Sequence, residues 1–289
     1  MHDDLDLPAY LERIGYRGEV APTLDALRRL HRLHPAAIAF ENLDSLTGAP
    51  VRLDLPSLGA KLVARRRGGY CFEQNRLFQA VLERFGFRVT PLIARVRWQR
   101  PPELVAAQTH MLLRVELDGA TWNLDVGFGA VTQTVPLAAT PGVAQRTPHG
   151  EYRLVEAPGA DAFDLEFLAA KGWQPVYRFV ARAVEQIDYE VANWYTSTHP
   201  DSKFVNDLIV SRVLPEGRAA LLNDTLTLRD ASGTATRHER LADAAAWAAC
   251  LDQRFDLDLD GFDIEQLFAR VQARSAALDA LAQAQSQSR

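Results

Sequence analysis

The chain has 289 residues, of which 47% are hydrophobic and 24% are charged, and its formal net charge is -5. This mild acidity argues against a general nucleic-acid-binding surface, although it leaves room for a local basic pocket that receives an anionic ligand. The start MHDDLDLPAY does not resemble a signal peptide, and no apolar run approaches the roughly 18 residues of a membrane span. We therefore expect a cytoplasmic protein that binds neither nucleic acid nor a membrane.

The first third of the chain has the periodicity of helices. PTLDALRRLHRL contains a helix-start signal, and Leu24, Leu27 and Leu30 follow it at helical spacing. His31 and His34 stand three residues apart near the end of this helix, but no carboxylate or cysteine nearby completes a ligand set. We expect these two histidines to be surface or boundary residues, and we expect no metal site.

Two further helices are predicted before residue 88. SLGAKLVARR has Ser57 as a plausible N-cap. The helix predicted within CFEQNRLFQAVLERFGF ends at Gly86 and carries a single apolar stripe. The stripe consists of Leu77, Phe78, Val81, Leu82 and Phe85.

The middle of the chain changes to the period of strands. RVTPLIARVRW alternates, with Ala94, Val96 and Trp98 on one face and arginines on the other. HMLLRVELDGATWNLDVGFG predicts a hairpin whose turn is Asp118-Gly119. EYRLVEA, FDLEFLA and PVYRFVARAV predict further strands, and TVPLAATPGVAQRTPHG predicts a loop.

The last third is mixed. DLIVSRVL and DTLTLRD predict short strands, whereas LADAAAWAACLDQRF and DIEQLFARVQARSAALDALAQ predict helices. Helices first, antiparallel strands next and a mixed end are typical of the α+β class.

The two cysteines, Cys71 and Cys250, are too few for a disulfide framework. Cys71 follows Gly68-Gly69 in the first turn of a predicted helix, where unpaired amides and the helix dipole favour an anion. The arginines at 65–67 add positive charge if any of them points toward the thiol, and such surroundings lower a thiol pKa. The residues alone leave Cys71 as either a nucleophile or a buried structural cysteine. Cys250, among small apolar residues in mid-helix, is interpreted as a packing residue.

His110 is the histidine best placed to serve as a base for Cys71, because it opens a strand of the predicted hairpin. With Asp118 and Gly119 as the loop, paired residue numbers sum to 237, so Asp125 lies one diagonal step from His110 on the same face. Asp125 could then fix the imidazole tautomer and stabilise the imidazolium. The alternatives are a strand-end carboxylate that accepts bonds from backbone amides, and a satisfied boundary histidine.

The segment RRGGYCFEQN resembles the RGGxCxEQN motif of the arylamine N-acetyltransferases. Other segments match that family in the same order: YLERIGY, LHRLHPAAIAFENLD, THMLLRV, WNLDVGFG and NWYTSTHPDSKFVNDLIVSR. Together they span roughly residues 10–212. The resemblance implies a helical bundle over 1–87 that carries the nucleophilic cysteine, a β-barrel over 88–200 that carries His and Asp, and an α/β lid over 201–289. It also implies a catalytic triad of Cys71, His110 and Asp125, as in papain-like and transglutaminase-like enzymes.

The reaction that the resemblance implies is acetyl transfer in two steps at one site. Cys71 takes an acetyl group from acetyl-CoA, and an arylamine, arylhydrazine or N-hydroxyarylamine then attacks the thioester, which gives ping-pong kinetics. Such a xenobiotic-metabolising enzyme would be a monomer or a homodimer that needs no metal. The alternatives are a related amide-forming transferase that uses another acyl donor, and a Cys-His-Asp amidase or peptidase.

The resemblance also assigns supporting residues. The amine pocket would be lined by Phe40, Val96, Phe128 and Phe204, and the cofactor would be contacted by Trp98, Gly127 and Gly129. A structural pair of Arg67 and Glu41 would hold the catalytic loop, and Glu73 and Asn75 would support the helix start. Two residues depart from the family pattern: Ala39 replaces a common proline, and Ala130 replaces a common glycine near the cofactor cleft.

Overall fold

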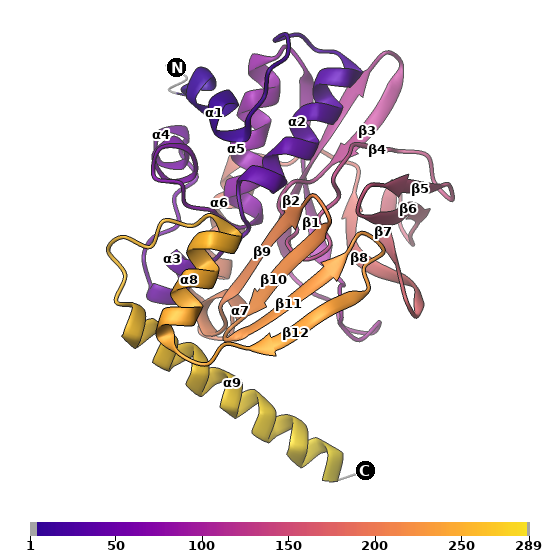
Figure 1. Cartoon of the computed structure of the whole chain (residues 1–289). Helices are drawn as coiled ribbons and strands as arrows, with labels where there is room; N and C mark the ends of the chain where they lie inside the picture. The colour runs from indigo at the N-terminus through magenta and orange to yellow at the C-terminus, as the bar shows by residue number, and fades with distance from the viewer. Residues whose placement is uncertain (1–4, 288–289) are drawn as a thin grey trace.

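The structure is a computed structural model that describes residues 5–287, and it has the predicted α+β architecture (Figure 1). Helices from the first third pack beside an eight-stranded antiparallel sheet. A four-stranded antiparallel sheet with the last two helices forms a third part. No helix among the described residues is long and apolar enough to cross a membrane.

The helical region contains the predicted helices and several short ones. The elements are α1 (Leu7–Ile14), α2 (Leu24–Ala37), α3 (Leu43–Thr47), α4 (Leu55–Leu58), the π-helix η1 (Gly59–Ala64) and α5 (Cys71–Arg84). The N-cap predicted at Ser57 is wrong, because the Asp54 side chain accepts the Ser57 amide at 3.0 Å and the helix begins at Leu55. Gly86 follows the end of α5 with φ +89°, as the predicted helix stop requires.

The large sheet curls into a nearly closed barrel with the strand order β4-β3-β2-β1-β8-β7-β6-β5. Its strands are β1 (Arg88–Val96), β2 (Gln108–Leu117), β3 (Ala120–Leu124), β4 (Leu137–Ala138), β5 (Ala144–Thr147), β6 (Gly150–Glu156), β7 (Ala162–Ala169) and β8 (Gly172–Val180). Strands β4 and β5 lie inside the segment predicted as a loop, so that prediction is wrong in part.

A side chain joins the two edges of the barrel. Gln145 on β5 accepts the Ala138 amide at 2.8 Å through Oε1 and donates to the Ala138 carbonyl at 2.9 Å through Nε2. The carboxamide thereby replaces one rung of a backbone ladder between β4 and β5, and it satisfies edge groups that a closed barrel would pair.

The hairpin predicted around Asp118-Gly119 is confirmed. Leu117 pairs with Ala120 and Leu113 pairs with Leu124, so paired numbers sum to 237. The ladder ends at Leu124, which places Asp125 directly after the strand.

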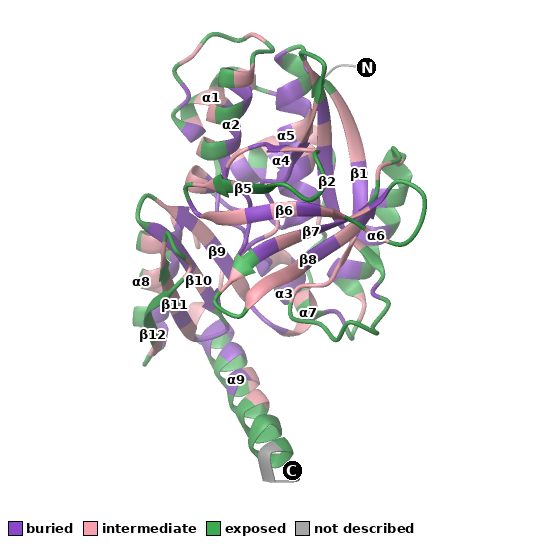
Figure 2. Cartoon of the chain, turned by 90° about the vertical axis from the view of Figure 1, so that its right-hand side faces the viewer, coloured by how far each residue is buried: buried purple, intermediate pink, exposed green. Residues whose placement is uncertain are grey.

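The four-stranded sheet has the order β12-β11-β10-β9 and packs against the C-terminal helices. Its elements are β9 (Ile209–Leu214), β10 (Gly217–Leu222), β11 (Thr225–Asp230), β12 (Ala235–Arg240), α8 (Ala244–Phe255) and α9 (Ile264–Gln287). In chain order, α6 (Gln186–Thr198) and α7 (Lys203–Asn206) come between the last strand of the large sheet and the first strand of the small one. The distal half of α9 extends away from the rest of the molecule and is largely exposed (Figure 2).

Three apolar cores support these parts. The first joins α1, α2 and α5 to β1–β3 and also takes Tyr189 and Ala192 from α6. The second lies under the small sheet, and the third fills the barrel. Phe40 connects the parts, because its backbone exchanges hydrogen bonds of 2.8 and 2.9 Å with Ser211 on β9 and forms a bridge with Gly69.

Candidate active site

Cys71 is the first residue of α5, and two glycines allow the chain to reach that position. A Cβ on Gly68 would lie 2.1 Å from the Ala39 carbonyl oxygen, and a Cβ on Gly69 would lie 2.8 Å from a Glu73 carboxylate oxygen. The backbone therefore passes closer to its neighbours than any larger residue allows. Cys71 itself is only 3% exposed.

Two of the three arginines before Cys71 are held by carboxylates. Arg67 donates to Glu41 at 2.7 and 3.0 Å and to Asp44 at 2.9 Å, which confirms the predicted Arg67–Glu41 pair. Arg66 is bound to Asp256. Because these two charges are paired, the groups that favour an anion at Cys71 are the amides of the first turn and the imidazolium of His110.

A second buried ion pair fixes the same helix start. Lys61 lies 2.6 Å from both Glu73 and Asp44. The other Glu73 oxygen accepts the Tyr70 amide at 3.0 Å, so the predicted role of Glu73 at the helix start is confirmed. Burial is the largest influence on Glu73 and raises its pKa to about 7, although Lys61 acts in the opposite direction.

His110 on β2 connects Cys71 to Asp125. Its Nε2 lies 2.7 Å from Asp125 Oδ2, and since a carboxylate only accepts, the imidazole donates this bond. Burial alone lowers the pKa of His110, but the Asp125 carboxylate, together with Cys71, raises it to about 10. Cys71 Sγ lies 3.6 Å from the carbonyl oxygen of Thr109, which is the residue before His110. The structure thus brings the three residues of the predicted triad together.

Asp125 is held by neighbours on three elements. Its Oδ1 accepts from the Asn75 side chain at 3.0 Å and from the Gly127 amide at 2.9 Å. Its own amide donates to His31 Nε2 at 3.1 Å. Asn75 also bonds the backbone of Met111 and Val126, so it supports the loop after β3 and not the start of α5, as the resemblance had implied.

His31 and His34 are fully buried, so the prediction that they are surface or boundary residues is wrong. Burial lowers the pKa of His31 to about 3 and that of His34 to about 4, which keeps both rings neutral near pH 7. His34 bridges the Tyr10 hydroxyl at 2.7 Å and Gln74 Oε1 at 2.5 Å. Each histidine stands four residues after an apolar leucine of α2, so the apolar stripe itself contained the signal for burial.

An aromatic residue that was not predicted for the site lies against His110. The Tyr177 ring on β8 lies 4.9 Å from the imidazole, and Phe128 lies 5.1 Å away on an edge. Burial, followed by the charge of Asp125, raises the pKa of Tyr177 well above its ordinary value. Of the predicted amine-pocket residues, Phe128 therefore contacts the imidazole, and Val96 pairs with Tyr177 in the ladder between β1 and β8.

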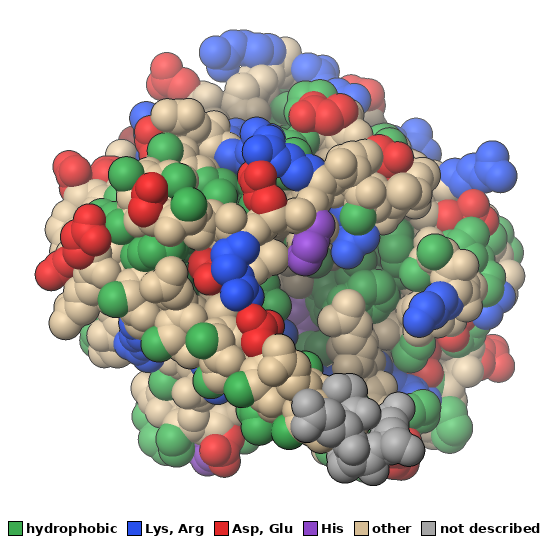
Figure 3. All heavy atoms as spheres, turned by 60° about the horizontal axis from the view of Figure 1, so that its bottom comes forward, with side chains coloured by type: hydrophobic (Ala, Val, Ile, Leu, Met, Phe, Trp, Pro, Cys, Tyr) green, Lys and Arg blue, Asp and Glu red, His purple; other side chains and the backbone are tan. Residues whose placement is uncertain are grey.

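The other two residues predicted for the amine pocket form a second aromatic group. The rings of Phe40 and Phe204 lie 6.0 Å apart, and Tyr70 lies 5.5 Å from Phe204. A Cβ on Gly129 would lie 3.6 Å from the Phe40 ring, so the residue after Phe128 joins the two groups. The face shown in Figure 3 is hollowed, with hydrophobic side chains inside the hollow and histidine at its edge.

The residues predicted to contact the cofactor lie in different surroundings. Trp98 packs at 6.1 Å against Phe167 of the barrel. A Cβ on Gly127 would lie 2.9 Å from Cys71 Cα, so this glycine lets the loop approach the cysteine backbone. Gly129 has φ +92°, a conformation that favours glycine.

Metal ligation has no support in the described residues, since none of their histidine, cysteine, aspartate and glutamate side chains form a group of three that could hold an ion. Cys71, His110 and Asp125 together supply a thiol, an imidazole and a carboxylate. This set suits nucleophilic acyl transfer.

Comparisons with known proteins agree with this chemistry. A family model described as N-acetyltransferase matches residues 23–272. The arylamine N-acetyltransferase of Mycobacterium tuberculosis is 44% identical over 259 residues, which cover 88% of this chain and 90% of the relative. An arylamine N-acetyltransferase / N-hydroxyarylamine O-acetyltransferase of Salmonella typhimurium is 38% identical, over 94% of this chain and 96% of the relative.

Solved structures share the fold. The arylamine N-acetyltransferase of Mycobacterium marinum in complex with CoA has a TM-score of 0.87 and is 41% identical. The match covers 92% of this chain and 98% of that chain. The fold expected from the sequence is thus confirmed both by the architecture and by a structural relative.

Proposed function

Because this chain belongs to the arylamine N-acetyltransferase family and is an acyltransferase with acetyl-CoA as its donor, we propose that it moves acetyl through a thioester on Cys71. The acceptor on this proposal is an aromatic amine or hydrazine. An N-hydroxyarylamine is a further acceptor, since the name of one relative includes that activity. The observation that supports the proposal most directly is the buried His110–Asp125 pair beside Cys71.

In the first step His110 holds the proton of the Cys71 thiol, so that the attacking group is a thiolate beside an imidazolium. The raised pKa of His110, about 10, favours this charged form of the ring. The thiolate attacks the acetyl carbonyl, the bond to the CoA sulfur breaks, and the imidazolium returns its proton to that sulfur. Asp125 keeps Nε2 occupied, so Nδ1 is the nitrogen that exchanges protons.

In the second step the amine attacks the acetyl-Cys71 carbonyl. His110 accepts the proton that the nitrogen loses, and Cys71 leaves as a thiolate, which restores the starting ion pair. On this proposal residues 1–87 provide the nucleophile and residues 88–200 provide the base and its carboxylate. The aryl ring of the acceptor binds among Phe40, Val96, Phe128 and Phe204. A flat apolar slot favours an aryl ring, because removing the ring from water costs less free energy than removing an aliphatic ammonium ion from water.

The burial of Cys71 supports transfer over hydrolysis. With 3% of the residue exposed, bulk water has little access to an acyl group on the sulfur until an acceptor enters. The amidase alternative would need a path for water to the thioester. A related transferase with a different acyl donor would share the thioester and differ only in the group that Cys71 carries.

Intact mass spectrometry tests the proposal directly. Mixing the protein with acetyl-CoA alone should add one acetyl group to Cys71, and an aromatic amine should remove it with formation of the amide. Cys71→Ala should abolish both events, whereas the matched variant Cys250→Ala should retain them. Rapid release of CoA without an amine would support the hydrolase instead, and an active Cys71→Ala protein would refute the thioester.

A further inference from the structure

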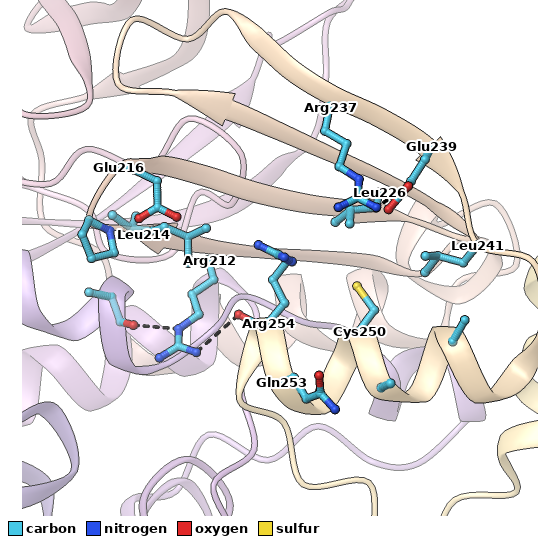
Figure 4. Close-up of a pocket in the computed structure, with 15 residues that line it drawn as sticks. Arg212, Leu214, Glu216, Leu226, Arg237, Glu239, Leu241, Cys250, Gln253 and Arg254 are labelled. Carbon is cyan, nitrogen blue, oxygen red and sulfur yellow. Dashed lines mark hydrogen bonds and ion pairs between the residues drawn. The ribbon is translucent and has the colours of Figure 1, made fainter.

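A cavity of about 750 Å³ lies between the small sheet and α8, away from the residues proposed to act in catalysis (Figure 4). None of the predicted catalytic, amine-pocket or cofactor residues lines it. Its volume falls in the range of about 300–1,000 Å³ that is typical of small-ligand sites. Strand β9 and helix α8 provide most of its walls, and Ala36 at the end of α2 closes one side.

Two of the three arginines that line this cavity, Arg212 and Arg254, form no ion pair with the described residues. Arg212 on β9 donates to the carbonyl oxygens of Ala36 at 2.7 Å and of Arg254 at 3.4 Å, and not to a carboxylate. Arg254 extends from α8 toward the sheet in Figure 4, and its guanidinium forms no ion pair with any residue in 5–287. Arg237 is already paired with Glu239 at 2.7 Å. The remaining lining therefore has two cations without an ion pair, Arg212 and Arg254, against one such carboxylate, that of Glu216, so its net charge is positive.

The region behind the cavity adds to this positive charge. Arg13 and Arg66 share one carboxylate, that of Asp256, and Arg13 also has two buried nitrogens without a hydrogen-bond partner. Burial lowers the pKa of Arg212, and the like charges of Arg13 and Arg66 lower it further, while Asp256 acts against them. The local potential therefore favours an anion, although the whole chain is acidic.

Apart from Gln253, the rest of the cavity wall is apolar. Leu214, Leu226 and Leu241 line it from the sheet side, and Cys250 points from α8 toward the sheet. An inorganic anion would leave this apolar surface exposed to water, whereas an anion with a hydrocarbon or aryl body would cover it.

We propose that this cavity binds an organic anion that has one carboxylate or sulfonate on an apolar body. The head group lies against the guanidinium groups of Arg254 and Arg212, which are suited to planar, bidentate recognition of an oxyanion. The apolar body lies along Leu226 and Leu241. Binding here requires neither acetyl-CoA nor Cys71, so the inference stands independently of the proposed function.

Calorimetric titration with decanoate tests the site, with decanol as the neutral ligand of equal length. Decanoate should bind at one site, and decanol should bind at least about tenfold more weakly, because one charge-assisted contact is lost. Arg254→Gln should weaken decanoate about tenfold, and since this side chain makes no ion pair, the variant should stay folded. Arg32→Gln, an exposed arginine on α2 with the same change of charge, is the matched control. Equal binding of decanoate to wild type and Arg254→Gln, or no binding at all, would overturn the proposal.

Cys250 reports where the ligand lies. In a Cys71→Ala protein it is the single thiol, and since burial raises its pKa, alkylation by iodoacetamide is followed at alkaline pH. Decanoate at about three times the dissociation constant of the protein with Arg254 should slow this alkylation several-fold in that protein and only slightly in Arg254→Gln. An unchanged rate at this concentration would place decanoate elsewhere and refute the assignment.

Discussion

Acid should weaken this fold through His34, whose ring is fully enclosed between Tyr10 and Gln74. Burial lowers its pKa from 6.5 to about 4 in the folded protein. Between these two values the unfolded chain binds a proton at this ring and the folded chain does not. The contribution of His34 to the free energy of unfolding is therefore fully present above pH 6.5, and it is lost as the pH falls toward the pKa of this ring in the folded protein.

The magnitude follows from the same two pKa values. One proton costs about 1.4 kcal/mol per pH unit within the window, so acidification from pH 7 to pH 5 removes about 2 kcal/mol of unfolding free energy through His34. His31 acts in the same direction, since its pKa is lowered to about 3. Glu73 acts in the opposite direction, because burial raises its folded pKa to about 7 and its contribution is lost as the pH rises. The difference in pH dependence between wild type and a variant of His34 therefore isolates the effect of this histidine from that of His31 and Glu73.

His34→Gln removes the titrating ring and keeps a polar side chain. Urea unfolding followed by tryptophan fluorescence at several pH values should show that wild type loses about 2 kcal/mol more than this variant between pH 7 and pH 5. The variant starts from lower stability because it loses the contacts of the ring, so the slope is the quantity to compare. His238→Gln, at an exposed position, should follow the wild-type slope. Parallel profiles for wild type and His34→Gln would refute the lowered pKa.

Other expectations concern the catalytic group and the barrel. The rate of Cys71 alkylation by iodoacetamide should persist at low pH in wild type and should lose that low-pH reactivity in His110→Gln, because the imidazolium no longer stabilises the thiolate; identical pH profiles would contradict this. Gly127→Ala should lower kcat at least about tenfold and cost about 1–3 kcal/mol of stability, since its Cβ would lie 2.9 Å from Cys71 Cα; normal steady-state kinetics would show that the loop can yield. Gln145→Leu should cost about 1 kcal/mol and speed amide hydrogen exchange at Ala138, whereas unchanged exchange would mean that the barrel edge is held by other contacts.

The local part of the site could be predicted from the sequence. The Asp118-Gly119 turn fixes the hairpin register, because a short loop leaves few ways to pair the flanking strands. That register predicted that Asp125 lies near His110, and the two side chains are 2.7 Å apart in the structure. The proximity of Cys71 to this pair depends on the packing of α5 against β2. It was implied by the resemblance to a known family and could not be predicted from periodicity.

Other elements were missed for physical reasons. Helix α6 exposes Ile187, Val191 and Trp194, of which Trp194 is 67% exposed, so its apolar residues do not mark a buried face. Strand β12 is an edge strand whose residues are nearly all exposed and polar, and it lacks the alternation that marks a half-buried strand. Tyr177 reaches His110 only because β8 pairs with β1, a contact between residues about eighty positions apart that no local pattern contains.

The run of arginines before Cys71 shows how a correct local argument can assign the wrong cause. Three positive charges beside a helix start favour an anion at the thiol in principle. In the structure Arg67 points to Glu41 and Asp44, and Arg66 turns away to Asp256 with φ +49°. The charge that remains next to the sulfur is that of His110, whose protonated form is stabilised by Asp125 on another element. The nucleophile proposed here therefore depends on a contact between α5 and β2, whereas Arg66 and Arg67 serve the fold by tying the loop before α5 to its neighbours.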